Sequence, residues 1–389
     1  MVNILDKTQC TGCTACASVC AHNAITMRFD EYGHSYPVVN TDACTDCKLC
    51  EKVCPLLHRD ILPTDKEGYD DLLIYAAYNK DSDVRSKSTS GGIFTLLAQY
   101  VISLGGCVYA ARFDDEYRIY HSSFDSMNDI DSYRGSKYAQ SDLGTVFRNI
   151  KKDLKTKPVL FVGSPCQVAG LKGYLRNEYP NLFTCDFICM CIASPVVWRE
   201  YLNDYWNVKD IKRIWFKDKR IGWHNWRMLI EDSKGEHLVK GKEDPFFSSY
   251  LSHLISRPSC NKCAFRNLHH ISDFTIADCW GIDEEKPSFD DNKGCTTIIL
   301  QSEKAISVFN NISSNIEYTK YPSYRIIKHN PYSKSDYSPN PDVKMFYKYY
   351  RDKGLRYAFD SVKKSKQKGL KSHIRLFFQF INKLFKRYL

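Results

Sequence analysis

Two matching runs of cysteine near the N-terminus constrain this chain more than any other feature. Each run has the spacing Cys-x2-Cys-x2-Cys-x3-Cys, and the second ends in Pro55. Every cysteine of the second run lies 34 residues after its counterpart, so the segment is an internal duplication. The two runs hold eight of the 17 cysteines of the 389-residue chain: Cys10, Cys13, Cys16 and Cys20, then Cys44, Cys47, Cys50 and Cys54.

This spacing is typical of cubane iron–sulfur sites. Three cysteines spaced by two residues hold one corner of a [4Fe-4S] cluster, and in two-cluster ferredoxins the fourth cysteine of each run serves the other cluster. We therefore assign Cys10, Cys13, Cys16 and Cys54 to cluster one, and Cys44, Cys47, Cys50 and Cys20 to cluster two. The alternatives are zinc and free thiols, but zinc sites typically use ligand pairs with longer gaps between them.

Residues 5–58 resemble bacterial-type two-cluster ferredoxins. Cys54-Pro55 keeps the proline that this family has after its fourth cysteine, whereas Ala21 replaces it in the first run. The replacement affects loop stiffness and not ligation.

The rest of the sequence excludes several classes of protein. No apolar run approaches the roughly 18 residues that a membrane-spanning helix needs. The first seven residues contain no apolar stretch with a cleavage site behind it, so we expect no secretory signal and a cytoplasmic location. In a reducing compartment we expect the cysteines to be metal ligands, reactive thiols or core residues, and not disulfides.

The patterning predicts an α+β multidomain fold, with a ferredoxin-like domain followed by a mixed α/β body. The length suggests two or three domains. We expect the ferredoxin domain over residues 1–58, a polar linker over 59–75, body regions over 76–155 and 156–320, and a tail over 321–389. Within the body the expected helices are 88–106 and 166–175, and the expected strands are 107–111, 159–162, 214–216 and 274–276.

Positive charge is concentrated in the tail. Residues 355–389 contain ten Lys or Arg and one acid, Asp360, which leaves the first 354 residues at a net charge of +1. A near-neutral body argues against nucleic-acid binding. Residues 371–389 have the pattern of a basic amphipathic helix, which suits either peripheral contact with an anionic membrane surface or docking on a protein.

Four cysteines of the body stand in suggestive settings. Cys166 follows Gly-Ser-Pro at the expected start of a helix, where the helix dipole favours thiolate over thiol. Cys189 ends a short apolar run, and Cys260-x2-Cys263 is a pair that suits iron–sulfur or zinc ligation. From the residues alone, a shared metal site and ordinary core positions are both open.

Two polar stretches could contact an anionic ligand. Ser90, Gly91 and Gly92 open the expected helix, where small residues let a phosphate approach free backbone N–H groups. Ser136, Lys137 and Tyr138 could offer a cation and hydroxyls. An ordinary helix cap and a solvated turn are the alternatives.

Together these stretches resemble the coenzyme F420 hydrogenase/dehydrogenase beta-subunit family over about residues 75–300. The motifs that carry the resemblance occur in the family's order: Ser90-Gly91-Gly92, Gly135-Ser136-Lys137-Tyr138, the segment 163–171, Trp215-Phe216-Lys217-Asp218-Lys219 with Gly222-Trp223, Arg257-Pro258-Ser259-Cys260 with Cys263, and Asp278-Cys279-Trp280-Gly281.

The resemblance implies FAD and a third [4Fe-4S] cluster in the body. Its candidate ligands are Cys166, Cys189, Cys260 and Cys263, and its candidate flavin contacts are Ser90, Gly91, Gly92, Ser136, Lys137 and Tyr138. One departure is Cys189-Met190-Cys191, where many relatives have Cys-His-Gly; Cys185 or Cys191 is therefore an alternative to Cys189 as ligand.

These features suggest a flavin-dependent iron–sulfur oxidoreductase. Clusters move single electrons, and a flavin converts them into the two-electron steps that organic substrates need. We expect an external electron donor or acceptor protein and a small-molecule substrate, and the resemblance adds a surface-polysaccharide pathway as one setting. The alternatives are an electron-transfer subunit that serves a partner enzyme and a non-catalytic iron–sulfur scaffold. Lys137, Lys217, Lys219 and His224 are possible anion or proton partners or ordinary surface residues; no catalytic residue is assigned.

Overall fold

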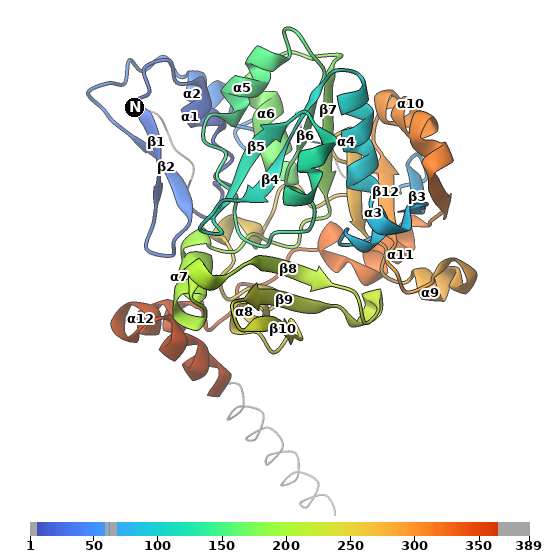
Figure 1. Cartoon of the computed structure of the whole chain (residues 1–389). Coiled ribbons are helices and arrows are strands. Elements are labelled where there is room, and N and C mark those ends of the chain that lie inside the picture. The colour runs from blue at the N-terminus through green and yellow to red at the C-terminus, as the bar shows by residue number, and fades with distance from the viewer. Residues whose placement is uncertain (1–5, 59–61, 63–67, 365–389) are drawn as a thin grey trace, which may run out of the picture.

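The computed structural model describes residues 6–58, 62 and 68–364. The predicted membrane-contacting segment, 371–389, lies outside these residues. Over the described part the chain is a mixed α/β protein with a small N-terminal unit beside a larger body (Figure 1). None of the helices in these ranges is both long enough and apolar enough to cross a membrane.

The N-terminal unit repeats its backbone geometry as well as its cysteines. Gly12 and Thr14 have φ of 68° and 66°, and their counterparts 34 residues later, Asp46 and Lys48, have φ of 52° and 58°. A short helix starts one residue after each pair. The duplication predicted from spacing is therefore confirmed in the conformation of the chain. The unit contains α1 (Ala15–Val19), α2 (Leu49–Lys52) and the antiparallel strands β1 (Ile25–Phe29) and β2 (Ser35–Val39).

The body is built on an eight-stranded sheet in the order β13-β3-β12-β11-β7-β6-β4-β5. The four central strands β4, β6, β7 and β11 are parallel to one another, and the remaining strands pair antiparallel. The strands are β3 (Leu73–Asn79), β4 (Cys107–Phe113), β5 (Ile119–Phe124), β6 (Val159–Val162), β7 (Leu182–Phe187), β11 (Phe274–Asp278), β12 (Thr296–Leu300) and β13 (Ile316–Lys320).

Helices cover both faces of this sheet, as buried parallel strands require. On one face a core forms around Leu97, Val101 and Phe309 of α4 and α10. On the other face Phe147 and Leu171, from α5 and α6, pack together with Ala15 and Val53 of the N-terminal unit. The helices are α3 (Ser82–Ser86), α4 (Ile93–Ser103), α5 (Val146–Asp153), α6 (Pro165–Leu175) and α10 (Glu303–Ile312).

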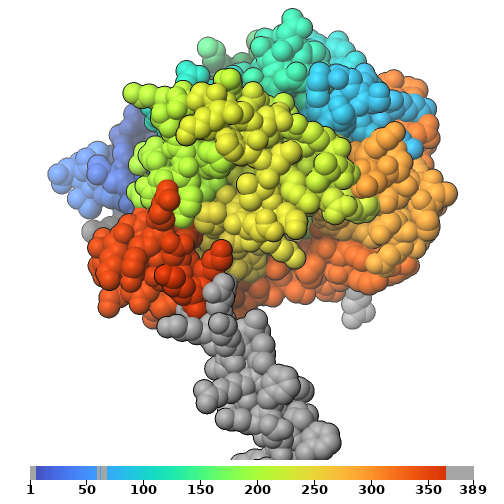
Figure 2. Space-filling view, turned by 60° about the horizontal axis from the view of Figure 1, so that its bottom comes forward, coloured from blue at the N-terminus to red at the C-terminus, as the bar shows by residue number. Residues whose placement is uncertain are grey.

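A second, three-stranded antiparallel sheet lies at one end of the large sheet (Figure 1). Trp198, Phe216 and Phe246 are buried in its core together with Phe346 from the C-terminal part. Figure 2 shows this sheet between the C-terminal helices and the segment that follows β11. Its elements and the remaining helices are β8 (Arg213–Asp218), β9 (Arg227–Asp232), β10 (Gly235–Val239), α7 (Pro195–Tyr205), α8 (Pro245–Leu251), α9 (Ile282–Glu285), α11 (Ser323–His329) and α12 (Val343–Lys353).

Most body elements expected from the sequence are present, with two differences. The helix expected from residue 88 begins at Ile93, because residues 88–92 form a turn and Gly92, with φ of 86°, precedes the helix. Beyond residue 321 the weak apolar pattern predicted little structure, yet α11 and α12 form there. Their burial depends on a few side chains, among them Ile326, Phe346 and Tyr347, which is too sparse to produce a clear helical period.

Candidate cluster and cofactor sites

The N-terminal unit brings the four cysteines assigned to cluster one to a single cavity. Cys10, Cys13, Cys16 and Cys54 all line this space of about 50 Å³, and Cys50 of the other run also reaches it. Burial, and then the neighbouring thiols, raise the pKa of Cys16 to about 12. Of the second run, Cys47 is exposed at the surface. Cys47 is thus the one cysteine of the eight that is exposed, whereas Cys13 of the first run contacts the body.

Two glycines on α6 allow the N-terminal unit to lie directly on the body. A Cβ atom at Gly170 would be 2.8 Å from the Sγ atom of Cys13, and one at Gly173 would be 2.4 Å from the backbone oxygen of Val53. Both distances are too short for any other residue. Cys13 therefore contacts the same helix that carries Cys166 near its first turn.

Two arginines of the body also bind the N-terminal unit. The buried Arg257 donates to the backbone oxygens of Cys10 at 2.8 Å and Ser35 at 2.9 Å, and to Gln140 at 2.9 Å. Arg148 donates to the backbone oxygens of Ser18 at 2.8 Å and of Cys20 at 3.1 Å. Each guanidinium therefore reaches the backbone of a predicted cluster ligand from the body side.

The four predicted ligands of the body face a second small cavity. Cys166 comes from α6, Cys189 follows β7, and Cys260 and Cys263 follow α8; all line a space of about 30 Å³. Cys185 lies in the core of the large sheet instead. Cys191 packs in the core beside the small sheet, with its thiol toward the backbone oxygen of Tyr250. The structure thus groups Cys189, and not its two alternatives, with the other three thiols.

The donor set and the surroundings fit an iron–sulfur cluster. Ser259 and Arg266 line the same cavity, and the buried atoms Ser259 Oγ and Arg266 Nε have no hydrogen-bond partner among the described residues. Such donors suit the sulfur atoms of a cluster. Within residues 6–58, 62 and 68–364, no three His, Cys, Asp or Glu side chains lie close enough to hold a single metal ion.

Burial keeps these thiols protonated while the site holds no metal. It raises the pKa of Cys260 to about 11, that of Cys263 to about 12 and that of Cys189 well above its usual range. The pKa of Cys166 is also raised by burial. Burial therefore acts against the stabilisation of the Cys166 thiolate that we expect at the start of α6. A bound metal would take the place of the proton.

A much larger cavity, of about 500 Å³, lies at the carboxyl ends of β6, β7 and β11. This is the edge of a parallel sheet at which ligands usually bind. Ser90, Gly92, Ser136, Lys137 and Tyr138, five of the six predicted flavin contacts, line it. Gly91 supports the wall from behind: its N–H donates to Thr296 Oγ1, and a Cβ atom there would be 2.4 Å from the backbone oxygen of Ala77.

The two cavities of the body share part of their wall. Cys189 lines both of them, together with Ile188, Ile192 and Tyr332. A cluster held by Cys189 would therefore be separated from the larger cavity only by the residues of this shared wall.

Buried charges line the larger cavity. Lys217 forms an ion pair with Asp278, which also accepts a hydrogen bond from Ser90. Burial alone would lower the pKa of Lys217, but the Asp278 carboxylate holds it above its ordinary value. Burial lowers the pKa of His121 to about 4, so its ring is neutral and bonds the backbone oxygen of Val162. Sequence reasoning named Asp278 only as part of the motif 278–281 and did not single out His121, which has no such motif around it.

The other candidates lie in different settings. His224 bonds Asp290 at 2.7 Å in the loop after β8. Lys219 donates to the backbone oxygen of Ser90 at 2.6 Å, so it touches the turn that lines the cavity.

Comparisons with known proteins agree with this architecture. A family model described as a 4Fe-4S dicluster domain matches residues 9–56. The N-terminal model of the coenzyme F420 hydrogenase/dehydrogenase beta subunit matches residues 74–148, and the C-terminal model of that subunit matches residues 156–323. The chain belongs to this family. It is an iron–sulfur electron-transfer protein of the F420 hydrogenase/dehydrogenase type, with a dicluster domain at its N-terminus.

A search of solved structures found a distant similarity to one chain of a hydrogenase complex. It comes from xenon derivatization of the F420-reducing [NiFe] hydrogenase complex of Methanosarcina barkeri, and it has 16% sequence identity, covers 77% of this chain and 94% of its own, and gives a TM-score of 0.46. No curated protein sequence matches the chain.

Proposed function

We propose that this chain is an iron–sulfur flavoprotein that relays electrons between a partner protein and an organic substrate. The observation that carries the proposal is that Cys189 lines both the four-thiol cavity and the 500 Å³ cavity. The order of sites would be the surface-exposed run with Cys47, then cluster one against α6, then the thiols of Cys166 and Cys189, and then the larger cavity.

FAD is the cofactor that we assign to the larger cavity. Bound there, it would exchange single electrons with the clusters and a hydride with the substrate. The chain supports this binding with small residues at Ser90 and Gly92, with apolar walls, and with the paired charges of Lys217 and Asp278. His121 is neutral and Lys217 is held by Asp278, so we assign no catalytic acid.

The partner protein would approach the second cysteine run. Cys47 is exposed, whereas Cys13 of the first run lies against α6. This exposure also favours a second candidate function, in which the chain is only the electron-transfer subunit of a larger oxidoreductase and the substrate binds elsewhere.

Anaerobic purification with quantification of iron, sulfide and flavin tests the proposal. We expect about twelve irons and one FAD per chain, the content of three [4Fe-4S] clusters and a flavin. Cys189→Ser should lose about four irons, whereas Cys185→Ser and Cys191→Ser, matched controls from the same segment, should keep all of them. Eight irons with no flavin in the parent protein would contradict the proposal and favour a scaffold. Turnover of an artificial donor by the isolated chain separates an enzyme from a transfer subunit.

A further inference from the structure

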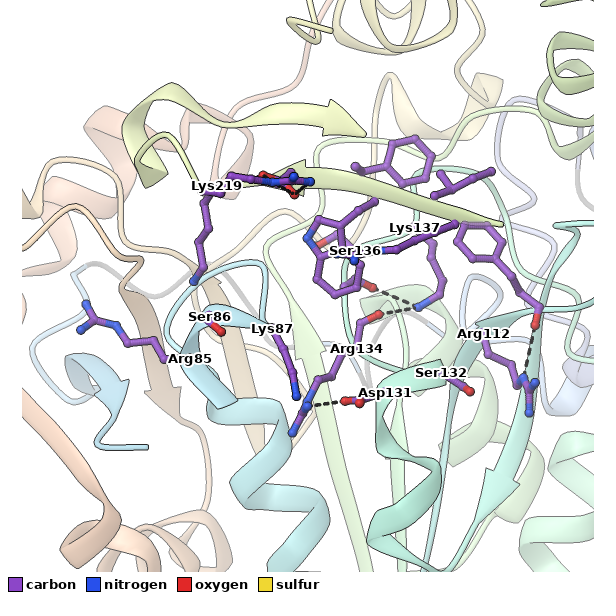
Figure 3. Close-up of a pocket in the computed structure, with 18 of the residues that line it drawn as sticks. Arg85, Ser86, Lys87, Arg112, Asp131, Ser132, Arg134, Ser136, Lys137 and Lys219 are labelled. Atoms are coloured by element: carbon purple, nitrogen blue, oxygen red, sulfur yellow. Dashed lines mark hydrogen bonds and ion pairs between the residues drawn. The ribbon is translucent and has the colours of Figure 1, made fainter. Parts of the chain in front are cut away.

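A second open space, which we call the basic cleft, joins the 500 Å³ cavity. It has a volume of about 1280 Å³ and lies between α3, the turn over residues 131–137 and strand β8 (Figure 3). The two spaces meet at Arg134, Gly135, Ser136 and Lys137, which line both. Sites for one small ligand typically measure about 300–1000 Å³, so the two spaces together have room for a cofactor and a second ligand.

The lining of the basic cleft is strongly positive. Eleven of its residues are Lys or Arg and five are Asp or Glu, although the first 354 residues carry a net charge of only +1. Four of the five acids, Asp114, Asp131, Asp218 and Glu236, are already bound by arginines. Among the residues that the structure describes, six cations of the cleft form no ion pair with a carboxylate: Arg112, Lys137, Lys212, Arg213, Lys219 and Lys293.

Two of these lysines are held by neutral groups at the junction with the cavity. Lys137 donates to the backbone oxygens of Arg134 and Gly135, each at 3.1 Å, and Lys219 donates to that of Ser90. Figure 3 shows Lys137 on the side of Arg112 and Lys219 on the side of Arg85. Carbonyl groups orient an ammonium without neutralising it. Burial, and then the nearby Arg112 or Arg85, lower the pKa of each lysine to about 7.

Aromatic rings stand among the cations. Phe113, Tyr117 and Trp215 line the cleft. The guanidinium of Arg213 lies 5.7 Å from the Trp215 ring, and the ammonium of Lys137 lies 5.6 Å from the Phe113 ring. Rings beside unpaired cations suit a ligand that has both a ring and multiple negative charges, because each part finds a matching surface.

We propose that the basic cleft binds the organic substrate and that this substrate is a ring compound carrying a diphosphate, of the nucleoside diphosphate class. The proposal deepens the proposed function, since it places the substrate beside the cavity assigned to FAD. FAD itself contains a diphosphate. The cations of the cleft could therefore bind either the diphosphate of a substrate or that of FAD, and the test must separate the two.

The test is calorimetric titration of the anaerobically purified full chain with UDP at pH 7.5, in two buffers of different ionisation enthalpy, with flavin release monitored by filtration. We expect UDP to bind while the flavin stays bound. We also expect proton uptake on binding, because an anion raises the pKa of Lys137 and Lys219.

The double variant Arg112→Gln with Arg213→Gln should weaken UDP binding at least about tenfold, or about 1.4 kcal/mol. Both arginines line only the cleft, so iron and flavin contents should not change. Lys209→Gln, an exposed position next to β8 but outside the cleft, should bind UDP as the parent does.

Three results overturn the proposal. The first is no heat of binding, and the second is UDP binding that the double variant leaves unchanged. The third is release of flavin in proportion to bound UDP, which would assign the cations to the diphosphate of the cofactor. A protein that purifies without flavin but binds UDP with the expected variant pattern would refute the proposed function and support the cleft.

Discussion

Replacing Arg257 should change both the redox potential of the neighbouring cluster and the attachment of the N-terminal unit. Its side chain is almost fully buried, at 1% exposure, and its three hydrogen bonds to oxygen go to the neutral oxygens of Cys10, Ser35 and Gln140. Among the described residues no carboxylate pairs with it. A buried cation without a counter-charge is costly, so we expect the negative charge of the bound clusters to stabilise it.

The size of the effect follows from one distance. The Nη2 atom of Arg257 lies 3.9 Å from the Sγ atom of Cys10. At an effective dielectric constant of about 20, a unit charge at that sulfur gains about 4 kcal/mol. The charge of a cluster is spread over all its atoms, so we take about 1–2 kcal/mol, equivalent to a shift of about 40–90 mV. Reduction adds negative charge, so Arg257→Met should lower the potential of cluster one.

Two further variants separate charge from hydrogen bonding. Arg257→Lys keeps the charge but cannot make all three hydrogen bonds, so it should keep most of the potential while loosening the N-terminal unit. Arg85→Met removes an equally buried arginine that pairs with Asp291, away from the cluster cysteines, and serves as the matched control. The potentials are measured by redox titration with electron paramagnetic resonance, and the attachment by amide exchange of β1 and β2.

Three outcomes of these measurements would contradict the role given to Arg257. If Arg257→Met moves no cluster potential further than Arg85→Met does, Arg257 is not electrostatically coupled to a cluster. An increase in potential would refute the sign of the argument. Unchanged exchange of β1 and β2 in Arg257→Met would show that its hydrogen bonds do not hold the unit in place.

Three other outcomes are expected. Gly170→Ala should lower the free energy of unfolding by about 1–3 kcal/mol through overpacking against Cys13, measured by chemical denaturation with Lys172→Ala as control; an unchanged midpoint would mean that the contact is not tight. Lys217→Met should cost about 3 kcal/mol of stability, because it leaves Asp278 largely buried without its cation, and Lys217→Met combined with Asp278→Asn should recover part of this loss. UDP affinity should fall as the pH rises from 6 to 8.5, since the two lysines with pKa about 7 lose their protons; a flat profile would exclude them as ligand contacts.

The sequence predicted the features that depend on residues close together in the chain, and not those that depend on packing of distant segments. The cluster-one ligands Cys10, Cys13 and Cys16 lie within seven consecutive residues, so their spacing alone predicts that they bind the same cluster. Cys166 and Cys260 are brought together only by packing of α6 against the segment after α8, so their spacing left the site open and the family resemblance was needed. The strand over 159–162 was predicted without error because a fully buried parallel strand is uniformly apolar.

The basic cleft could not be predicted for the same reason. Its cations come from β4, from the turn over 131–137, from β8 and from the loop before β12, and each one alone has the sequence signal of a solvated surface residue. Lys219 is an example: its position in the chain gives no sign that its ammonium reaches the backbone of Ser90. Only the fold reveals that these charges share one space and that six of them form no ion pair with a carboxylate of the described residues.

The absence of side chains at Gly170 and Gly173 has a consequence for electron transfer through the molecule. One rigid rod, α6, touches Cys13 along its middle and presents Cys166 at its start, so the spacing between these two thiols is set by a single helix and not by a tether. Electron transfer between clusters held by these two thiols would then need no movement of the N-terminal unit. Its rate should be insensitive to solvent viscosity, in contrast to electron carriers that must diffuse between docking positions.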